Sequence, residues 1–166
     1  RGAEACSRPS EGLVSLVSTA YDAMIARVEA LFPVTHGSYQ RLSNPYDVEA
    51  NPDIYLDMGW GVAFGPAVNT NRNLCSLVTT KRTVTVVLTR TNDATDNDDT
   101  GRDAVVKALL EDGRTVVNDF ERGFRLADAD INCQFISDGG VETAGPDDSF
   151  YYVLRLQFEV ELFDAP

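Results

Sequence analysis

Histidine, cysteine and basic residues are all scarce in this chain of 166 residues. The only histidine is His36, and the three cysteines, Cys6, Cys75 and Cys133, stand far apart. We therefore expect neither a zinc cluster nor a disulfide framework, and we expect a reducing compartment. The chain has 14 basic and 26 acidic residues, which gives a net charge of −12. We expect no tight binding to nucleic acid, because phosphate binding requires a basic surface.

Long apolar runs are also missing. No stretch approaches the roughly 18 consecutive apolar residues that indicate a membrane-spanning helix. The first ten residues, RGAEACSRPS, lack the apolar core of a signal peptide. We expect residues 1–10 to form an N-terminal arm and residues 11–166 to form one domain, since the length and the 43% apolar content suit a single hydrophobic core.

The end of the chain carries the clearest pattern. Residues 150–163, FYYVLRLQFEVELF, alternate between apolar and polar side chains with a period of two. Successive side chains of a strand point to opposite faces, so this pattern predicts a long β-strand with one face on the core. The core-facing residues are expected to be Tyr152, Leu154, Leu156, Phe158, Val160 and Leu162.

Two segments have the spacing of amphipathic helices. The first runs from an N-cap at Ser10 to Leu31, before Pro33. The second runs from Thr100 to Arg122, with Gly123 as its expected C-terminal stop. Its central glycine at position 113 weakens it by about 1 kcal/mol relative to alanine.

Three further strands are predicted, over residues 54–64, 74–91 and 130–137, with loops over 34–53, 65–73, 92–101 and 138–149. Gly59 and Gly61 share one face of the first and indicate either close approach of a neighbouring backbone or a bulge. The threonine-rich face of the second is expected to meet solvent or a partner, and no charged residue is expected to face inward on the clearest strands. The fold class is therefore α+β, with a mostly antiparallel sheet packed by two amphipathic helices.

No pattern in the chain indicates catalysis. The run from Asp96 to Gly101 matches the first half of a calcium-binding EF-hand loop, but the twelfth position is Lys107 where that loop needs glutamate. His36 stands alone in a predicted loop, and Glu159 and Glu161 are two residues apart on a polar strand face. Phosphate-binding glycine motifs and serine-hydrolase elbows are missing as well. We expect no enzymatic activity, no metal and no cofactor.

Two apolar side chains break the alternation of the last strand. Tyr151 and Val153 fall on the face that should be exposed, with Phe163 on the same face. Apolar groups on an exposed face indicate burial by a partner. Both are candidate interface residues.

The order of elements is similar to that of a viral family. A long first helix (LVSLVSTAYDAMIARVEALFP), a strand pair with an extended loop, a second helix (DAVVKALLEDGRTVVNDFERG) and a terminal strand (YYVLRLQFEVELF) follow one another. This arrangement resembles the tail-terminator proteins of long-tailed bacteriophages, and more broadly their neck and tail-completion proteins. The resemblance covers most of residues 11–164 and rests on element order and on the pattern of the terminal strand.

The resemblance implies a ring, with six subunits, that caps the head-proximal end of the tail tube. The partners would be other copies of the chain, the tail-tube protein and the head-side connector, in a virion assembled in the host cytoplasm. DNA would pass through an acidic lumen without specific binding. The acidic loops would contact these partners, through the candidate residues Asp96, Asp98, Asp99, Asp147 and Asp148.

Other functions stay open on the sequence. The nearest is another virion protein, such as a tube subunit, a head-completion protein or a capsid decoration protein. A more distant alternative is a small-ligand-binding α+β domain, which needs polar groups that converge in a pocket.

Overall fold

One mixed sheet organises the part of the chain that the structure describes. The structure is a computed structural model, and it describes residues 16–32, 39–52, 57–69, 78–91, 99–127, 131–145 and 151–164. These residues form a five-stranded sheet in the order β1-β2-β3-β5-β4. The strands are β1 (Gln40–Arg41), β2 (Met58–Asn69), β3 (Val78–Thr91), β4 (Ile131–Ala144) and β5 (Tyr151–Asp164).

The long terminal strand lies inside the sheet, between β3 and β4. Both of its pairings are antiparallel and extend over most of its length. Consequently β3 and β4 run parallel, and the helix that joins them makes a crossover past β5. The short β1 adds a parallel pairing at the other side of β2, limited to Gln40 with Gly59 and Arg41 with Trp60.

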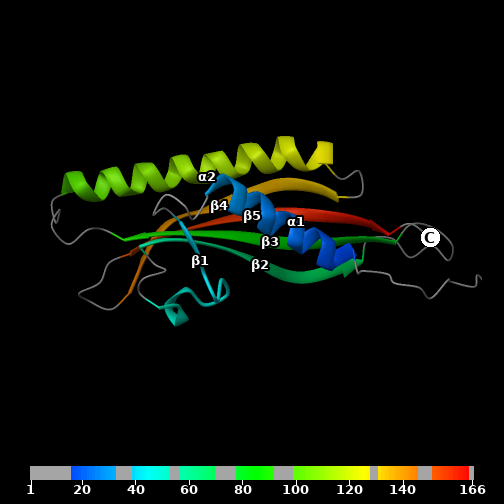
Figure 1. Cartoon of the computed structure of the whole chain (residues 1–166), viewed down its shortest axis with the longest axis horizontal. Helices are drawn as coiled ribbons and strands as arrows, with labels where there is room; N and C mark the ends of the chain where they lie inside the picture. Colours follow the sequence, from blue (N-terminus) through cyan, green and yellow to red (C-terminus); the bar gives the residue numbers. More distant parts are fainter. Residues whose placement is uncertain are drawn as a thin grey trace, which may run out of the picture.

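Both helices cover the same face of the sheet, which we call the helix face (Figure 1). They are α1 (Leu16–Leu31) and α2 (Asp99–Ala127). α2 runs along β4 and β5, whereas α1 lies over β2. Arg27 of α1 and Asp119 of α2 form a two-pronged ion pair, with N–O distances of 2.9 and 3.1 Å, that joins the two helices. No helix of the described ranges is long and apolar enough to cross a membrane.

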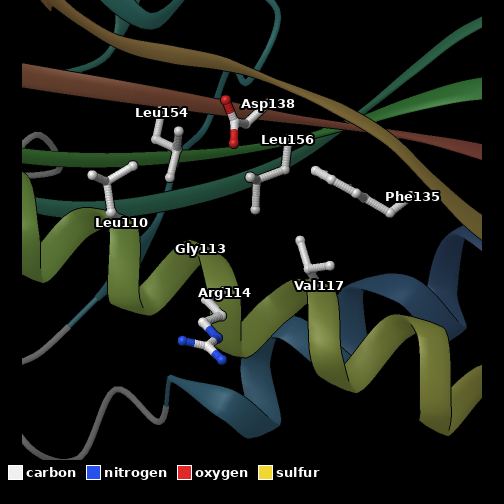
Figure 2. A pocket seen from close by; sticks show the side chains of 8 residues that line it. All are labelled: Leu110, Gly113, Arg114, Val117, Phe135, Asp138, Leu154 and Leu156. Carbon is white, nitrogen blue, oxygen red and sulfur yellow. The ribbon is translucent and has the colours of Figure 1, made fainter.

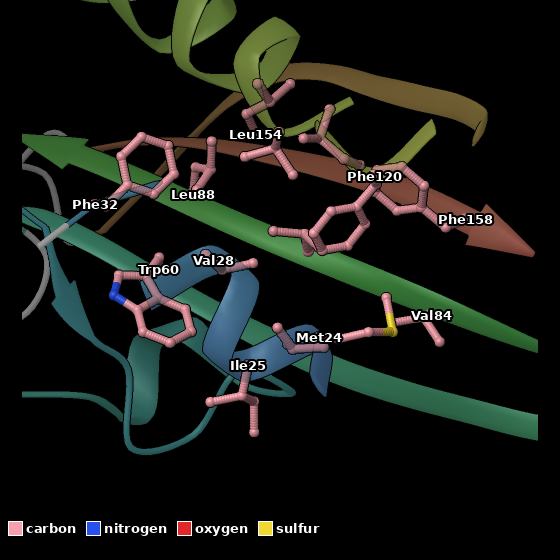
Figure 3. Packing of buried hydrophobic residues seen from close by; sticks show 14 of the residues in the cluster. Met24, Ile25, Val28, Phe32, Trp60, Val84, Leu88, Phe120, Leu154 and Phe158 are labelled. Carbon is pink, nitrogen blue, oxygen red and sulfur yellow. The ribbon is translucent and has the colours of Figure 1, made fainter. Parts of the chain in front are cut away.

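The main core lies between the helices and the sheet. Phe120 of α2 packs against Phe158 of β5 with ring centroids 4.9 Å apart, and Phe135 of β4 reaches Phe158 at 5.6 Å. Each large apolar side chain that is fully buried here contributes about 1.5–3 kcal/mol. Figure 3 shows the layer that joins α1, β2, β3, α2 and β5, with Met24, Val28, Trp60, Val84, Leu88, Phe120, Leu154 and Phe158 among its labelled members.

The sequence-based fold class is confirmed: the chain is an α+β domain with two helices on a mostly antiparallel sheet. The alternation of the terminal strand is confirmed too, since Tyr152, Leu154, Leu156, Phe158 and Val160 all belong to the core. The expected N-terminal arm over 1–10 and the N-cap Ser10 lie outside the described residues.

Three boundaries predicted from the sequence were wrong. β2 continues through residues 65–69, because a bulge between Phe64 and Ala67 accommodates Pro66 inside an edge strand. β4 continues through residues 138–144, because bulges absorb the Gly139-Gly140 pair. α2 passes Gly123 and ends at Ala127, so this glycine does not stop it.

Candidate assembly surfaces

A partly buried polar network joins three elements at one end of the sheet. Tyr39, just before β1, is 1% exposed, and its hydroxyl donates a hydrogen bond to a carboxylate oxygen of Asp112 on α2. Arg90 of β3 donates through Nε to the Tyr39 hydroxyl at 3.0 Å and through a terminal nitrogen to Asp112 at 2.7 Å. Its guanidinium also lies 5.4 Å from the centre of the Tyr39 ring. The expectation that no charged residue faces inward on the clearest strands was therefore wrong.

The network is suited to holding elements together. Burial, with the hydrogen bond to Asp112 in second place, raises the pKa of the Tyr39 phenol well above its ordinary value. The phenol is thus neutral at physiological pH, and its oxygen is hydrogen-bonded to both Asp112 and Arg90. Since hydrogen bonds to charged groups contribute about 1.5–3 kcal/mol each, the network fixes α2 and the segment before β1 relative to β3.

The described part of the long loop, residues 39–52, crosses to the other side of the sheet; we call it the strap. Its residues Leu42 and Val48 pack on Val87, Tyr151 and Val153, which form a second apolar cluster on the face opposite the helices. We call this opposite side the far face. A short 3-10 helix, η2 (Val48–Ala50), lies in the strap. The strap therefore covers one end of the far face.

Asn51 holds the strap in shape. Its side-chain oxygen accepts hydrogen bonds from the Ser43 hydroxyl at 3.0 Å and from the Asn44 backbone N–H at 2.8 Å. Its side-chain nitrogen donates to the carbonyl oxygens of Asn44, Asp47 and Val48 at 2.9–3.0 Å. The residue is only 5% exposed, so this set of bonds makes the strap a rigid part of the fold.

Gly61 of β2 explains how closely the strap approaches the sheet. A Cβ atom at this position would stand 2.6 Å from the Cβ of Pro45. The sequence-based expectation of a close approach at this glycine pair holds at Gly61, but the atoms that come near are side-chain atoms of Pro45 and Leu42 and not backbone.

The strap corrects the interpretation of two candidate interface residues. Tyr151 and Val153 were expected on an exposed face, yet they are 3% and 0% exposed. The expectation of exposure was wrong, because the chain's own strap covers them. The threonine-rich face of β3 is divided too, since Thr89 is buried whereas Thr83 is exposed.

The aspartate candidates give no assembled site. Asp96, Asp98, Asp147 and Asp148 lie outside the described residues, and Asp99 is the first residue of α2. His36 is outside as well. Within the described ranges no three histidine, cysteine or acidic side chains are grouped so that they could hold a metal ion.

The uncovered end of the far face is polar. Lys81 of β3 pairs with Glu159 of β5 at 2.6 Å, and Arg155 of β5 pairs with Glu142 of β4. Glu159 is thus held by a lysine on the neighbouring strand. These ion pairs are partly exposed and contribute less than about 1 kcal/mol each.

The two edges of the sheet differ. Beyond Trp60, β2 has no strand neighbour among the described residues on its outer side. The backbone N–H of Phe64 there donates to the Tyr46 hydroxyl at 3.2 Å, and Pro66 has no N–H. Tyr46 is 68% exposed, and Val68 is 62% exposed. This outer side of β2, with Tyr46, Pro66, Ala67 and Val68, is called the β2 edge below.

The opposite edge has a groove. Between α2 and β4 lies a pocket of about 190 Å³ (Figure 2). Leu154 and Leu156 of β5 line it, as does Gly113, where a Cβ would come within 2.5 Å of the Leu154 side chain. Leu110 lines it from α2 and is 43% exposed, and Asp138 lines it from β4. We call this site the α2–β4 groove.

Comparisons with known proteins add no family. No protein-family model matches the sequence, and no curated protein gives a significant match. The function must therefore be inferred from the chain itself.

Proposed function

We propose that this chain is a structural virion protein, the tail terminator of a long-tailed bacteriophage. In this function it forms a ring that caps the head-proximal end of the tail tube and presents a surface to the head-side connector. The partners are further copies of the chain, the tail-tube protein and the connector. DNA passes through the lumen.

The difference between the two sheet edges is the observation that carries the proposal. A ring needs one surface of each subunit to meet a different surface of the next. The β2 edge exposes Tyr46 and Val68, while the α2–β4 groove opens at the opposite edge beside the exposed Leu110. Two unlike apolar surfaces on opposite sides are suited to a head-to-tail contact.

The arrangement of elements gives further support. The resemblance rests on a first helix, strands, a second helix and a long terminal strand, and this order is found here with the terminal strand inside the sheet. Rigid connections also suit a ring subunit, since its two contact surfaces must stay at a fixed angle for the ring to close. Such connections are provided by the network of Tyr39, Arg90 and Asp112, by the hydrogen bonds of Asn51 to the strap, and by the ion pair between Arg27 and Asp119.

The net charge is consistent with a channel for DNA. A charge of −12 on each subunit disfavours tight binding to phosphates. Acidic residues on the lumen would let DNA slide through, whereas a basic lumen would contradict this part of the proposal.

Electron microscopy of the purified chain at high concentration, with and without magnesium, tests ring formation. We expect closed rings with a central hole, and sedimentation should give the mass of one closed assembly. Continuous tubes would instead favour a tube subunit. Monomers that gain thermal stability from a panel of metabolites would favour a ligand-binding domain.

A further inference from the structure

We propose that a small polar pocket beside the end of β1 binds a carboxylate group, with the Arg41 guanidinium and the Val62 backbone N–H as the hydrogen-bond donors. The pocket has a volume of about 240 Å³, and residues of α1, the strap and β2 line it: Tyr21, Arg41, Leu42, Ser43, Pro45 and Val62. We call it the edge pocket. Carboxylate binding here goes beyond the proposed function and does not depend on it.

The edge pocket lies where β1 stops short along the outer side of β2. The last bond of their pairing runs from the Leu42 N–H to the Trp60 carbonyl oxygen at 2.7 Å. Further along β2, the Phe64 N–H donates to the Tyr46 hydroxyl at 3.2 Å. Val62 lies between these two bonds and lines the pocket. The strand edge is therefore paired on either side of Val62 and open at Val62 itself.

The Val62 N–H points out of the sheet toward this opening. Along a strand, alternate residues direct their backbone N–H and C=O groups to the same side. Trp60 and Phe64 both use outward groups, so the Val62 groups between them point outward too. Val62 is only 3% exposed, and no described residue outside the sheet pairing accepts a hydrogen bond from its N–H. A buried backbone donor without a partner favours the binding of an acceptor.

Arg41 supplies the positive charge of the edge pocket. Its guanidinium lies 5.8 Å from the centre of the Trp60 ring, and no carboxylate in the described ranges forms an ion pair with it. By contrast, Arg27, Lys81 and Arg90 each have a carboxylate partner within the chain. An arginine that lies on an aromatic ring keeps N–H groups available for an anion.

A carboxylate is the anion that fits these donors. One guanidinium balances the single charge of a carboxylate, whereas a phosphate group carries about −1.5 to −2 at pH 7. The net charge of −12 on the chain adds repulsion for the more highly charged anion. The Ser43 hydroxyl adds no donor, because it donates to the Asn51 side-chain oxygen at 3.0 Å. The carboxylate can belong to a small molecule or to an acidic side chain of a second copy.

Trp60 fluorescence tests the site, because Trp60 is the only tryptophan of the chain. Sodium acetate is titrated into dilute protein at constant ionic strength, with sodium chloride as the balance. We expect a saturable change in emission, because bound acetate draws the Arg41 guanidinium away from the indole ring. Acetamide, which has nearly the same shape without the charge, should give no change.

Arg41→Gln removes the charge and keeps a polar side chain at this exposed position. We follow acetate binding to this variant through the NMR signal of the Val62 amide, which does not depend on the stacking of Arg41 on Trp60. The substitution should weaken binding by about tenfold or more, as expected for the loss of a charge-assisted contact. Arg102→Gln, at an exposed position of α2, is the matched control and should bind acetate as the wild type does.

Four results would overturn the proposal: no saturable change with acetate, an equal change with acetamide, equal binding by Arg41→Gln, or tighter binding of inorganic phosphate than of acetate. Sedimentation at high protein concentration then identifies the source of the carboxylate. Oligomers that dissociate in acetate and are lost in Arg41→Gln would assign it to a second copy. Association that is unchanged by acetate would assign it to a small molecule.

Discussion

Replacing Tyr39 by phenylalanine removes one oxygen from the network that fixes α2 and the strap to β3. The substitution deletes the hydrogen bond that Tyr39 donates to Asp112 and the one that it accepts from Arg90 at 3.0 Å. The ring remains packed on Phe32, with centroids 4.4 Å apart. Hydrogen bonds to charged groups contribute about 1.5–3 kcal/mol each. Because Arg90 and Asp112 keep their own 2.7 Å contact, we expect a net loss of about 2 kcal/mol.

Urea unfolding measures this loss. With an m-value of about 1–3 kcal/mol/M, the midpoint should fall by about 1 M while m itself stays constant. Tyr46→Phe is the matched control, since it removes the same atom from an exposed side chain that only accepts from the Phe64 N–H. Its free energy of unfolding should change by less than about 0.5 kcal/mol. Equal losses for the two variants would refute the importance of the network.

The raised pKa of Tyr39 predicts how the free energy of unfolding depends on pH, and the same variant tests it. Since the pKa of Tyr39 is raised in the folded state, the phenol stays protonated there at pH values where the unfolded chain ionises. Its contribution to stability is complete below the ordinary pKa of about 10 and is lost as the pH rises above it. Tyr39→Phe should therefore have a flatter stability profile above pH 10. A profile parallel to that of the wild type would contradict this assignment.

Three further predictions concern the strap and the core. Asn51→Ala should cost about 2–4 kcal/mol and increase binding of a hydrophobic dye, because buried backbone groups lose their partners; the exposed Asn118→Ala should change neither. Gly61→Val should cost about 1–3 kcal/mol by urea unfolding, because its Cβ would clash with Pro45, and an unchanged midpoint would refute the close approach. Burial raises the pKa of Cys133 to about 12, and Glu121 adds to the shift. In a variant with serine at the other two cysteines, the native protein should therefore resist a thiol reagent at pH 8 and react on unfolding. Rapid reaction in the native state would contradict the burial.

The sequence predicted the elements whose side chains keep one period. β5 alternates with period two throughout, and its pairing with β3 is unbroken, so its core face was correct although β4 on its other side is bulged. β4 and β2 were predicted too short, because their bulges place glycine or Pro66 inside a strand. A bulge depends on the partner strand, and local residue preferences alone do not indicate it.

The polar network left a signal in the sequence. Arg90 continues the spacing of Val84, Val86 and Leu88 on β3, and Asp112 falls on the helical stripe that includes Leu109 and Val116. Two opposite charges in phase with two apolar faces indicate an ion pair between helix and strand. Tyr39 had no such signal, because its position depends on how the strap turns around the sheet edge.

The burial of Tyr151 and Val153 could not be predicted from their own strand. Their alternation placed them correctly on the far face, yet what covers them is the strap, about 100 residues earlier in the sequence. Leu42 and Val48 belong to no periodic pattern. The groove likewise depends on tertiary features, since it arises where Gly113 meets β5 beside a bulged β4.

Capping of tail tubes tests the central claim most directly. The tail-tube protein encoded by the same genome would be polymerised with and without this chain, and tube lengths and ends would be measured by electron microscopy. We expect tubes that stop growing and carry one ring at a single end. Tubes that grow to the same length in its presence, with bare ends and all of this chain left in solution, would contradict the terminator function.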